Sequence, residues 1–329
     1  MKRFLWLLAF APFVVGFAGQ TRRLANDGLL APDLSQSYDY DGVALPAYYT
    51  SGPVAEADNT PASNPITDPG ATLGRVLFFD RRLSVNDTVS CGSCHQQVNG
   101  FADPRPRSAG FRGGRTARHS MGLTNVRYFF GGRMFWDERA FSLEDQATRP
   151  LADQTEMGWL DMRELPAKLE KVNFYPPLFE KAFGDDEITI ERIALALAQF
   201  QRTLVSYRSR YDLALQHPDR IDEHLTAEEQ RGMALFGAMP VAQMEERGWS
   251  ADTAVGCADC HQTEAMISGL VSDTPDVDRA ARGYTQARRQ GIDNGLPGMA
   301  VAFKAPSLRN IEVTAPYMHD ARFNTLEQV

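Results

Sequence analysis

The sequence predicts a mostly α-helical protein made of two similar halves. Three observations support this expectation. Apolar residues recur at helical spacing in several segments, few segments alternate as β-strands do, and the order helix, Cys-x-x-Cys-His, loop occurs twice. Glycine-rich loops separate the helical segments, and a chain of 329 residues ordinarily contains two domains.

The clearest predicted helix starts after Thr189. The Thr189 hydroxyl can cap the first turn, and Glu191 stabilises that turn because its negative charge lies near the positive end of the helix dipole. One apolar stripe runs along this segment: Ile190, Ile193, Leu197, Phe200 and Leu204. We expect this stripe to pack in the core.

Two further helices are predicted ahead of the Cys-x-x-Cys-His sites. Segment 71–84 stops just before the first site, and its apolar residues lie near helical spacing: Leu73, Val76, Leu77 and Phe78. A second clear helix begins near Thr226 and leads towards the second site.

The four cysteines form two Cys-x-x-Cys pairs, each followed directly by a histidine. The two sets are Cys91, Cys94 and His95, and Cys257, Cys260 and His261. This is the attachment pattern of c-type haem, in which the thiols add to the vinyl groups and the histidine ligates the iron. Zinc and disulfide bonds are the alternatives, but a zinc site normally draws its pairs from a short stretch of chain. We therefore expect two covalently bound haem c groups.

The N-terminal segment predicts export. Residues 1–19 have the layout of a secretory signal peptide, with a basic start, an apolar run too short for a comfortable membrane span and small residues near Ala18. Because haem is attached to such proteins outside the cytoplasm, we expect a periplasmic protein. The alternative is an uncleaved membrane anchor, since Arg22 and Arg23 follow closely. Residues 20–66 are rich in Pro, Ser, Asp, Asn and Thr, and predict a lead-in strap.

The formal net charge of -8 argues against a nucleic-acid partner. An acidic surface can steer a basic electron donor towards the protein. It can also serve only to keep the protein soluble.

Three longer segments surround the haem motifs: "LFFDRRLSVNDTVSCGSCHQ", "MFWDERAFSLEDQATRPL" and "FKAPSLRNIEVTAPYMHDARF". In order and spacing they resemble the bacterial di-haem cytochrome c peroxidase family, which includes the MauG branch. The resemblance runs from about Asp68 to the last residue. It implies two cytochrome c-like haem domains packed face to face: an N-terminal peroxidatic domain at 67–213 and a C-terminal electron-transfer domain at 214–329.

The resemblance also implies an active site around the first haem. Trp136 stands at the family's bridging position between the two haems, where an indole can relay an electron. Gln146, Pro150 and Glu156 match the family's distal pocket. Reduction of hydrogen peroxide needs a base that moves a proton from one oxygen to the other, and a carboxylate such as Glu156 can do this. Gln146 could orient the peroxide oxygens, and Pro150 could shape the pocket without adding a ligand.

The sixth ligand of the first haem differs from that of many relatives. Where they have a histidine that caps the iron until reduction removes it, this sequence has Phe111. Because a phenyl ring cannot ligate iron, we expect the first haem to be open, as in the MauG branch. His119, further along the same loop, is the rival ligand.

Other departures from the family lie towards the C-terminus. Relatives often hold a calcium ion between the domains with an asparagine side chain and two backbone carbonyls. The carbonyls match those of Thr314 and Pro316, but His119 stands at the asparagine position, and an imidazole is a poor ligand for calcium. Bound calcium is therefore only one possibility here. Glu138 and Ala321 replace common glycines, which we expect to alter local turns.

The sixth ligand of the second haem, methionine in the peroxidases and tyrosine in the MauG branch, is expected beyond Val329, so the sequence has the pattern of a truncated chain. Met318 is a weaker candidate for this ligand. We expect His319 to be structural, and His217 and His224 to lie in a polar interdomain linker.

The leading functional hypothesis is a peroxidase that takes electrons at the second haem from a small donor protein of the cytochrome c or cupredoxin type. One rival is a MauG-like oxidase of a protein or small molecule. Against its closest version, Val255 stands where the best-known MauG has a tryptophan for electron exit. The second rival is a di-haem electron carrier without turnover.

Overall fold

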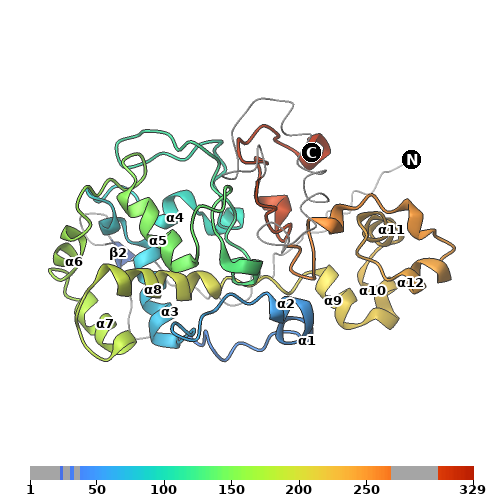
Figure 1. Ribbon diagram of the computed structural model, residues 1–329, viewed down its shortest axis with the longest axis horizontal. Coiled ribbons are helices and arrows are strands. Elements are labelled where there is room, and N and C mark those ends of the chain that lie inside the picture. Colours follow the sequence, from blue (N-terminus) through green and yellow to red (C-terminus); the bar gives the residue numbers. More distant parts are fainter. Residues whose placement is uncertain (1–22, 25–29, 33–37, 268–302) are drawn as a thin grey trace, which may run out of the picture.

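The computed structural model describes residues 23–24, 30–32, 38–267 and 303–329. These residues are mostly helical, as predicted (Figure 1). The α-helices are α1 Ala47–Thr50, α2 Gly52–Glu56, α3 Asp68–Phe79, α4 Cys91–Cys94, α5 Leu143–Ala152, α6 Glu164–Leu169, α7 Tyr175–Phe183, α8 Ile190–Arg202, α9 Arg210–Gln216, α10 Ile221–His224, α11 Ala227–Phe236 and α12 Val241–Glu246.

Short 3-10 helices and one small sheet complete the described elements. The 3-10 helices are η1 Arg81–Leu83, η2 Gln97–Asn99, η3 Val126–Tyr128, η4 Phe130–Gly132, η5 Pro218–Arg220, η6 Ala251–Thr253, η7 Cys257–Asp259, η8 Ile311–Val313 and η9 Leu326–Gln328. Strands β1 Arg23–Leu24 and β2 Leu30–Ala31 pair antiparallel, with Arg23 opposite Ala31. The proposed signal peptide at residues 1–19 lies outside the described residues. No helix in the described part of the chain is both long enough and apolar enough to cross a membrane.

Helices α3 and α8 cross at the centre of the first half. The predicted Thr189 cap is present, because its hydroxyl accepts from the Arg192 backbone N–H at 3.1 Å. Helix α8 ends at Arg202, so Leu204 lies just past the helix, although it is still buried. At the crossing, a side chain on Gly74 would meet the Ala196 carbonyl oxygen at 1.9 Å. Glycine therefore permits the close approach that buries the apolar faces of both helices.

A smaller helical lobe, α9 to α12, makes up much of the second half. It has its own core of buried side chains: Ala214, Ile221, Leu225, Ala234, Met239 and Met244. Helix α11 begins as predicted, with Thr226 and Glu229 in a capping box. His217 ends α9 and His224 lies in α10, with ring centroids 5.8 Å apart. The C-terminal segment 303–329 lies between this lobe and the first half (Figure 1).

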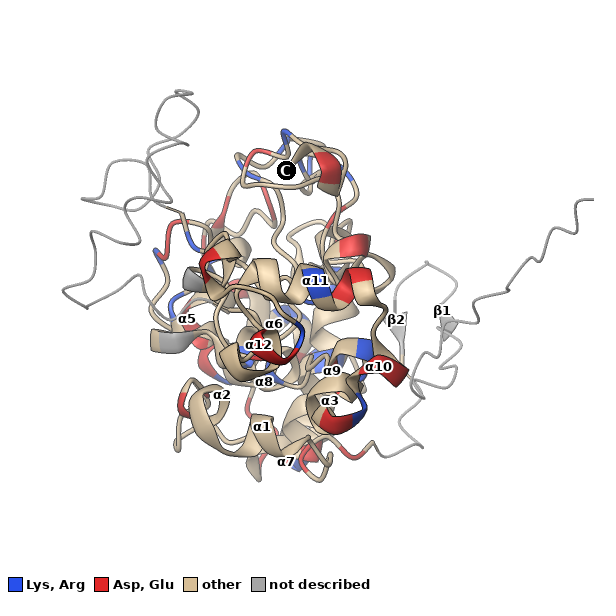
Figure 2. Cartoon of the chain, turned by 90° about the vertical axis from the view of Figure 1, so that its right-hand side faces the viewer, with Lys and Arg blue, Asp and Glu red and all other residues tan. Residues whose placement is uncertain are grey.

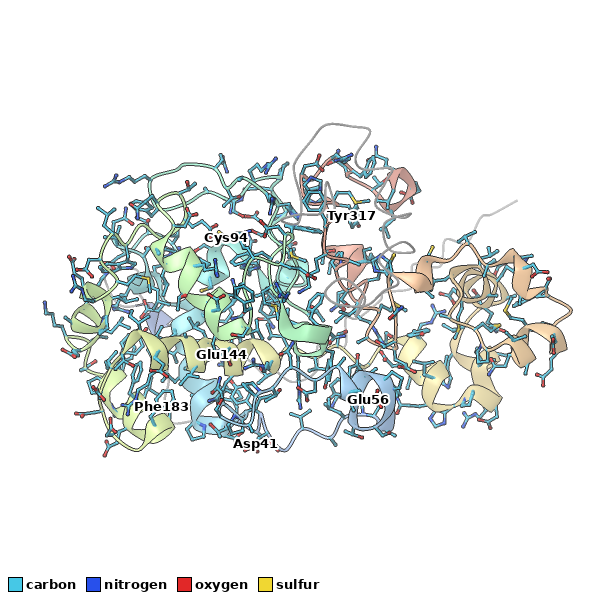
Figure 3. All side chains as sticks on the ribbon, viewed as in Figure 1. Asp41, Glu56, Cys94, Glu144, Phe183 and Tyr317 are labelled. Atoms are coloured by element: carbon cyan, nitrogen blue, oxygen red, sulfur yellow. The ribbon has the colours of Figure 1, made fainter. Side chains whose placement is uncertain are left out.

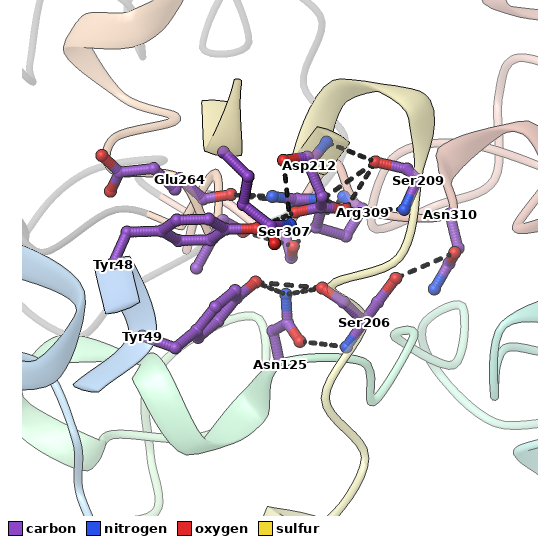
Figure 4. Close-up of polar contacts among 12 residues, drawn as sticks. Tyr48, Tyr49, Asn125, Ser206, Ser209, Asp212, Glu264, Ser307, Arg309 and Asn310 are labelled. Atoms are coloured by element: carbon purple, nitrogen blue, oxygen red, sulfur yellow. Dashed lines mark hydrogen bonds and ion pairs between the residues drawn. The ribbon is translucent and has the colours of Figure 1, made fainter. Parts of the chain in front are cut away.

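The strap packs more closely than its composition suggests. Tyr49 and Val54, in α1 and α2, are buried in the main core. The Tyr48 hydroxyl donates to Asp212 Oδ1 at 2.6 Å, and the Tyr49 hydroxyl donates to the Ser206 carbonyl at 3.0 Å (Figure 4). The strap therefore contacts the chain at the start of the second half.

The described residues that follow the two Cys-x-x-Cys-His sites share two local features. In both, the histidine N–H donates to the carbonyl of the first cysteine, at 2.9 Å for His95 and 3.0 Å for His261. Further on, each loop has a left-handed asparagine that starts a 3-10 helix, Asn125 with φ 63° and Asn310 with φ 61°. Similar sequences thus give similar loops in the two halves.

The repeat continues through residues 134–140 and 317–323. Each stretch is closed by an isolated antiparallel bridge between its end residues. Trp136 and His319 take the same place in the two stretches. Glu138 and Ala321 are also equivalent, with left-handed φ of 51° and 61°. The turn therefore has the conformation that glycine prefers, which explains why the family commonly has glycine there.

Candidate active site

A cavity of about 650 Å³ lies in the first half, within the range of sites that hold cofactors. Its wall includes most of the residues predicted around the first haem, but not Phe111; those that line it are Cys91, Cys94, His95, Trp136, Gln146, Pro150 and Glu156. Figure 3 marks the place of Cys94 among the helices of this half. Leu197 of α8 also lines the cavity, so the predicted apolar stripe contributes to its wall.

His95 is oriented by the backbone on one side of its ring. Nδ1 lies 2.8 Å from the Phe101 carbonyl oxygen and 3.0 Å from that of Met121. Because a carbonyl only accepts, Nδ1 carries the proton and Nε2 keeps its lone pair. Burial also lowers the pKa of His95, which favours the neutral ring. This is the form in which histidine ligates a metal.

Two loops hold Glu156 at the cavity. The Phe111 N–H donates to the Glu156 carbonyl at 2.9 Å, and the Glu156 N–H donates to Asp153 Oδ1 at 3.1 Å. Burial, together with the nearby Asp153 carboxylate, raises the pKa of Glu156 to about 7, although Arg139 opposes this. The carboxyl group can therefore both hold and release a proton near neutral pH.

Helix α5 presents Gln146 and Pro150 on one face, since they are four residues apart. The helix starts at the Ser142 cap, whose hydroxyl accepts from the Asp145 N–H at 3.1 Å. Pro150 lies inside the helix and has no N–H for the Gln146 carbonyl. The cavity wall at α5 therefore has one polar side chain, that of Gln146, beside three side chains without a ligand atom: Leu143, Ala147 and Pro150.

Phe111 and His119 occupy different surroundings. Phe111 is buried, and its ring packs on Gly158 so closely that a Cβ there would lie 2.4 Å from it. His119 borders the cavity, but its Nε2 lies 2.7 Å from the Asp103 carbonyl oxygen. That contact engages Nε2 of His119, so the lone pair of its neutral ring lies on Nδ1.

Trp136 lies between the first cavity and the C-terminal segment. Its Nε1 donates to the His119 carbonyl at 2.8 Å, and its own carbonyl accepts from the Lys304 N–H at 2.8 Å. Its ring meets the His319 ring edge-on, with centroids 6.3 Å apart. His319 in turn stacks on Phe303 at 3.8 Å.

The second Cys-x-x-Cys-His site repeats the histidine orientation. His261 Nδ1 lies 3.0 Å from the Pro306 carbonyl oxygen, and burial lowers the pKa of the ring. The structure therefore leaves Nε2 of both motif histidines with its lone pair.

The cysteines fit haem better than the alternatives. All four are free of disulfide bonds. In the described part of the chain, the only close cluster of three or more metal-binding side chains is an exposed acidic trio, Asp39, Asp41 and Asp68. The two Cys-x-x-Cys pairs thus do not meet in a zinc site, whereas each stands beside an oriented histidine.

Comparison with known proteins agrees with this geometry. A family model described as di-haem cytochrome c peroxidase matches residues 68–220. The methylamine utilization protein MauG of Methylorubrum extorquens is 34% identical over 98% of this chain and 83% of its own length. The cytochrome c551 peroxidase of Nitrosomonas europaea is 34% identical over 78% of this chain and 70% of its own. A crystal structure of a MauG-like protein associated with microbial copper homeostasis has 31% identity and a TM-score of 0.67, covering 89% of this chain and 81% of that one.

The chain belongs to the di-haem cytochrome c peroxidase family. It is therefore an oxidoreductase with the cytochrome c-like, all-α fold of that family, and the family implies haem c as its cofactor.

The residues at the family's calcium position do not fit calcium. His119, Thr314 and Pro316 do border one small cavity, of about 70 Å³. Among the described residues no carboxylate lines it, His119 offers an imidazole, and Arg309 forms part of its wall. Calcium prefers six to eight oxygen ligands, several of them anionic. Met318 also borders this cavity.

Sequence reasoning missed the charged residues around the first cavity. Asp137 pairs with both Arg118 and Arg139, each at 2.7 Å. Lys304 reaches the cavity wall from the C-terminal segment, and burial lowers its pKa to about 7, although Glu138 opposes this. Asp137 and Arg139 directly follow Trp136, and Lys304 interrupts an apolar run, "VAFKAP". Charged residues close to Trp136, and a lysine within an apolar run, are the sequence features from which these site residues could have been predicted.

Proposed function

We propose that this protein is an exported, periplasmic peroxidase that reduces hydrogen peroxide to water with electrons from a small redox protein. Hydrogen peroxide, two electrons and two protons give two waters. The observation that carries the proposal is the shared cavity, because His95 and the acid-base candidate Glu156 both line it. Haem c, when bound, supplies the iron that carries electrons and activates peroxide.

The chain's own residues would hold the cofactors. Cys91 and Cys94 would form thioether bonds at the first site, and His95 Nε2 would ligate the iron. Cys257, Cys260 and His261 would do the same at the second site. The backbone contacts of both Nδ1 atoms support this assignment, since they fix the rings before the cofactor is bound.

Glu156 would move the proton. Its carboxylate would accept the proton from one peroxide oxygen and return it to the other, so that breaking of the O–O bond releases that oxygen as water. The two electrons and two further protons would convert the remaining oxygen into the second water. Its raised pKa supports this role, because the ideal catalytic pKa lies near the working pH. The amide of Gln146 would orient the peroxide by hydrogen bonding, and Pro150 would add no competing ligand.

We also propose that the first site keeps a ligand position open. Phe111 cannot ligate iron, and His119 Nε2 is engaged by the Asp103 carbonyl. Trp136 would relay electrons between the sites, which its contacts with both the first cavity and the C-terminal segment support. The domain limits 67–213 and 214–329 are part of this proposal.

The acidic surface suits a basic electron donor. Acidic side chains lie on α10, α11 and α12 (Figure 2), and Gly237 at the end of α11 lies close to Ala258 in the second site. Opposite charges raise association rates, so the donor's reaction rate should fall as salt is added.

Rapid mixing of the fully oxidised, haem-loaded protein with peroxide tests the proposal. We expect a high-spin contribution in the starting spectrum and a fast spectral change on mixing. A protein that is only an electron carrier would have both irons capped and would show neither.

Glu156→Gln tests the proton transfer. Losing the general base should slow peroxide reduction by about 100-fold or more, measured with a reduced c-type cytochrome as donor. Glu170→Gln is the matched control, because Glu170 is exposed and lies outside the cavity wall. A Glu156→Gln rate within about twofold of the parent would remove Glu156 from the mechanism.

A MauG-like oxidase is the second candidate, favoured by the 34% identity to MauG over 98% of this chain. Against the closest version of this candidate, Val255, at the position where the best-known member of the MauG branch has an electron-exit tryptophan, is aliphatic and 71% exposed. Steady peroxide consumption that depends on a reduced donor supports the peroxidase. Peroxide consumption that instead depends on an oxidisable protein would support the oxidase.

A further inference from the structure

Lys304 is a buried cation that belongs to one half of the chain and reaches into the other. Its side chain is only 4% exposed, and it lines the first cavity although it comes from the C-terminal segment. Burying an ammonium group is costly unless its donors find partners. Such a residue therefore calls for an explanation.

The ammonium group has three partners, all in residues 129–134. Its Nζ donates to the Arg133 carbonyl, lies 3.8 Å from Met134 Sδ and stands over the Phe129 ring, 3.4 Å from the centroid. No carboxylate among the described residues lies within ion-pair distance of Nζ, although the charge of Glu138 is near enough to raise the pKa of Lys304 against the effect of burial. A carbonyl, a thioether and an aromatic ring therefore hold the ammonium group in place, and a salt bridge does not.

The Lys304 backbone contacts the same turn. Its N–H donates to the Trp136 carbonyl at 2.8 Å. Two contacts from one residue, at Arg133 and Trp136, fix the turn that carries the Trp136 ring. The equivalent hydrogen bond runs in the opposite direction between the halves: the His119 N–H donates to the carbonyl of His319, the residue equivalent to Trp136, at 2.8 Å.

Lys304 is also close to the part of the chain that orients His261. Two residues later, the Pro306 carbonyl accepts from His261 Nδ1 at 3.0 Å. One residue earlier, Phe303 stacks on His319, which meets the Trp136 ring edge-on. A short stretch of chain, 303–306, thus connects the second haem-ligand candidate with Trp136.

We propose that Lys304 is a positioning residue that holds Trp136 at a fixed place between the two haem sites. The inference rests on the proposed relay through Trp136. Electron transfer between the sites depends on the position of the Trp136 indole. The Lys304 side chain restricts the conformation of the turn that carries this indole.

Lys304→Met in the haem-loaded protein tests this role. Methionine keeps the length of the apolar stem and the backbone N–H, and removes only the ammonium. After one-electron reduction, electron equilibration between the two haems should slow by about 10-fold or more, as expected for a displaced relay. The ferric spectrum should not change.

Lys168→Met is the matched control. Lys168 also donates to a carbonyl, that of Ser84 at 2.7 Å, and lies 5.2 Å from the centroid of the Trp159 ring, but it lies outside the cavity wall. This variant should keep the parent rate. Lys304→Leu is a second test variant in case the methionine variant does not fold, because leucine also removes the donor to the Arg133 carbonyl and keeps the backbone N–H.

The outcomes separate the two proposals. A parent rate in any folded Lys304 variant would overturn the positioning role, as would a slower rate fully explained by shifted midpoint potentials. If Trp136→Phe keeps the parent rate, the relay itself is wrong. A parent protein that does not react with peroxide would end the peroxidase proposal, yet haem-to-haem equilibration would still report on Lys304.

Discussion

Glu156 shows how a loop residue acquires chemical properties from its surroundings. In sequence it belongs to a polar stretch, "DQTE", which ordinarily marks a solvated loop. In the structure its carboxyl faces a cavity, where burial disfavours the charged form and Asp153 adds repulsion. The raised pKa is therefore a product of packing.

A pH profile should report this environment. If Glu156 is the base, it must be ionised, so peroxide reduction should increase with pH through a midpoint near the pKa of about 7 and then level off. Asp153→Asn should move this midpoint downwards, because it removes the like charge while its Oδ1 can still accept from the Glu156 N–H. A midpoint that is unchanged in both Asp153→Asn and Glu156→Gln would mean that another group titrates.

At the scale of elements, close backbone contacts place the cavity loops. Loop 108–116 lies directly on loop 153–158, and a Cβ on Gly110 would stand 1.5 Å from the Thr155 carbonyl oxygen. Only glycine permits this contact, which carries the Phe111 to Glu156 hydrogen bond.

Gly110→Ala should therefore displace the loop that carries Glu156. We expect a loss of about 1–3 kcal/mol in the free energy of unfolding, typical of overpacking, together with slower peroxide reduction. Gly114→Ala is the control, because its Cβ would only touch Thr155 Cγ2 at 3.5 Å. Equal stability and activity in the two variants, by chemical denaturation and donor oxidation, would contradict this account.

At the scale of the whole molecule, one buried ion pair joins several distant segments. Arg309 Nη1 and Asp212 Oδ2 are 2.7 Å apart, and both side chains are almost fully buried. Arg309 also donates to the Glu264 carbonyl, and Asp212 accepts from Tyr48 and Ser209 (Figure 4). The strap, α9, the loop after the second haem site and the C-terminal segment thus meet here.

Asp212→Asn should destabilise the protein by about 3 kcal/mol, since it leaves Arg309 buried without its counter-charge. Burial alone would raise the pKa of Asp212, but Arg309 and its other donors hold it below the ordinary value. The ionised carboxylate thus stabilises the fold above the unfolded-state pKa of about 3.9, and this contribution is lost as the pH falls through the lower folded-state pKa.

Denaturation curves at pH 7 and in acid check this prediction, because the difference from the parent should shrink in acid. Asp161→Asn is the control, since Asp161 pairs with the exposed Arg163 at the surface and should show no measurable change. An Asp212→Asn variant as stable as the parent at neutral pH would show that the pair is unimportant.

Calcium should also be dispensable for the whole molecule. Because the cavity at Thr314 and Pro316 has no carboxylate and includes Arg309, treatment with a calcium chelator should leave the thermal unfolding temperature unchanged. Elemental analysis should find no stoichiometric calcium. One tightly bound calcium per chain, with a lower unfolding temperature after its removal, would refute this.

Local patterns were sufficient for several elements. The Thr189 and Thr226 caps start helices where they were expected, because capping depends on neighbouring residues. The strap was less predictable, since Tyr49 is buried through contacts with Ser206 and Asn125, far away in sequence. Trp136, Gln146, Pro150 and Glu156 could be predicted from the resemblance to the family. Lys304 also lies in one of the quoted family segments, but its role could not be predicted, because no local pattern shows which cavity a distant lysine enters.

The sequence by itself determined the chemistry available to this protein. The two Cys-x-x-Cys-His sites follow from residue type and spacing, and the resemblance of the sequence to the family implied Trp136 and the set Gln146, Pro150 and Glu156. The tertiary structure alone decided that this set shares a cavity with His95, that His119 Nε2 bonds to Asp103, and that Lys304 connects the halves at Trp136. The physical reason is the separation along the chain over which each interaction acts. Residue spacing determines contacts between neighbours in the sequence, whereas burial, shifted pKa values and contacts between the halves arise only when distant segments pack together.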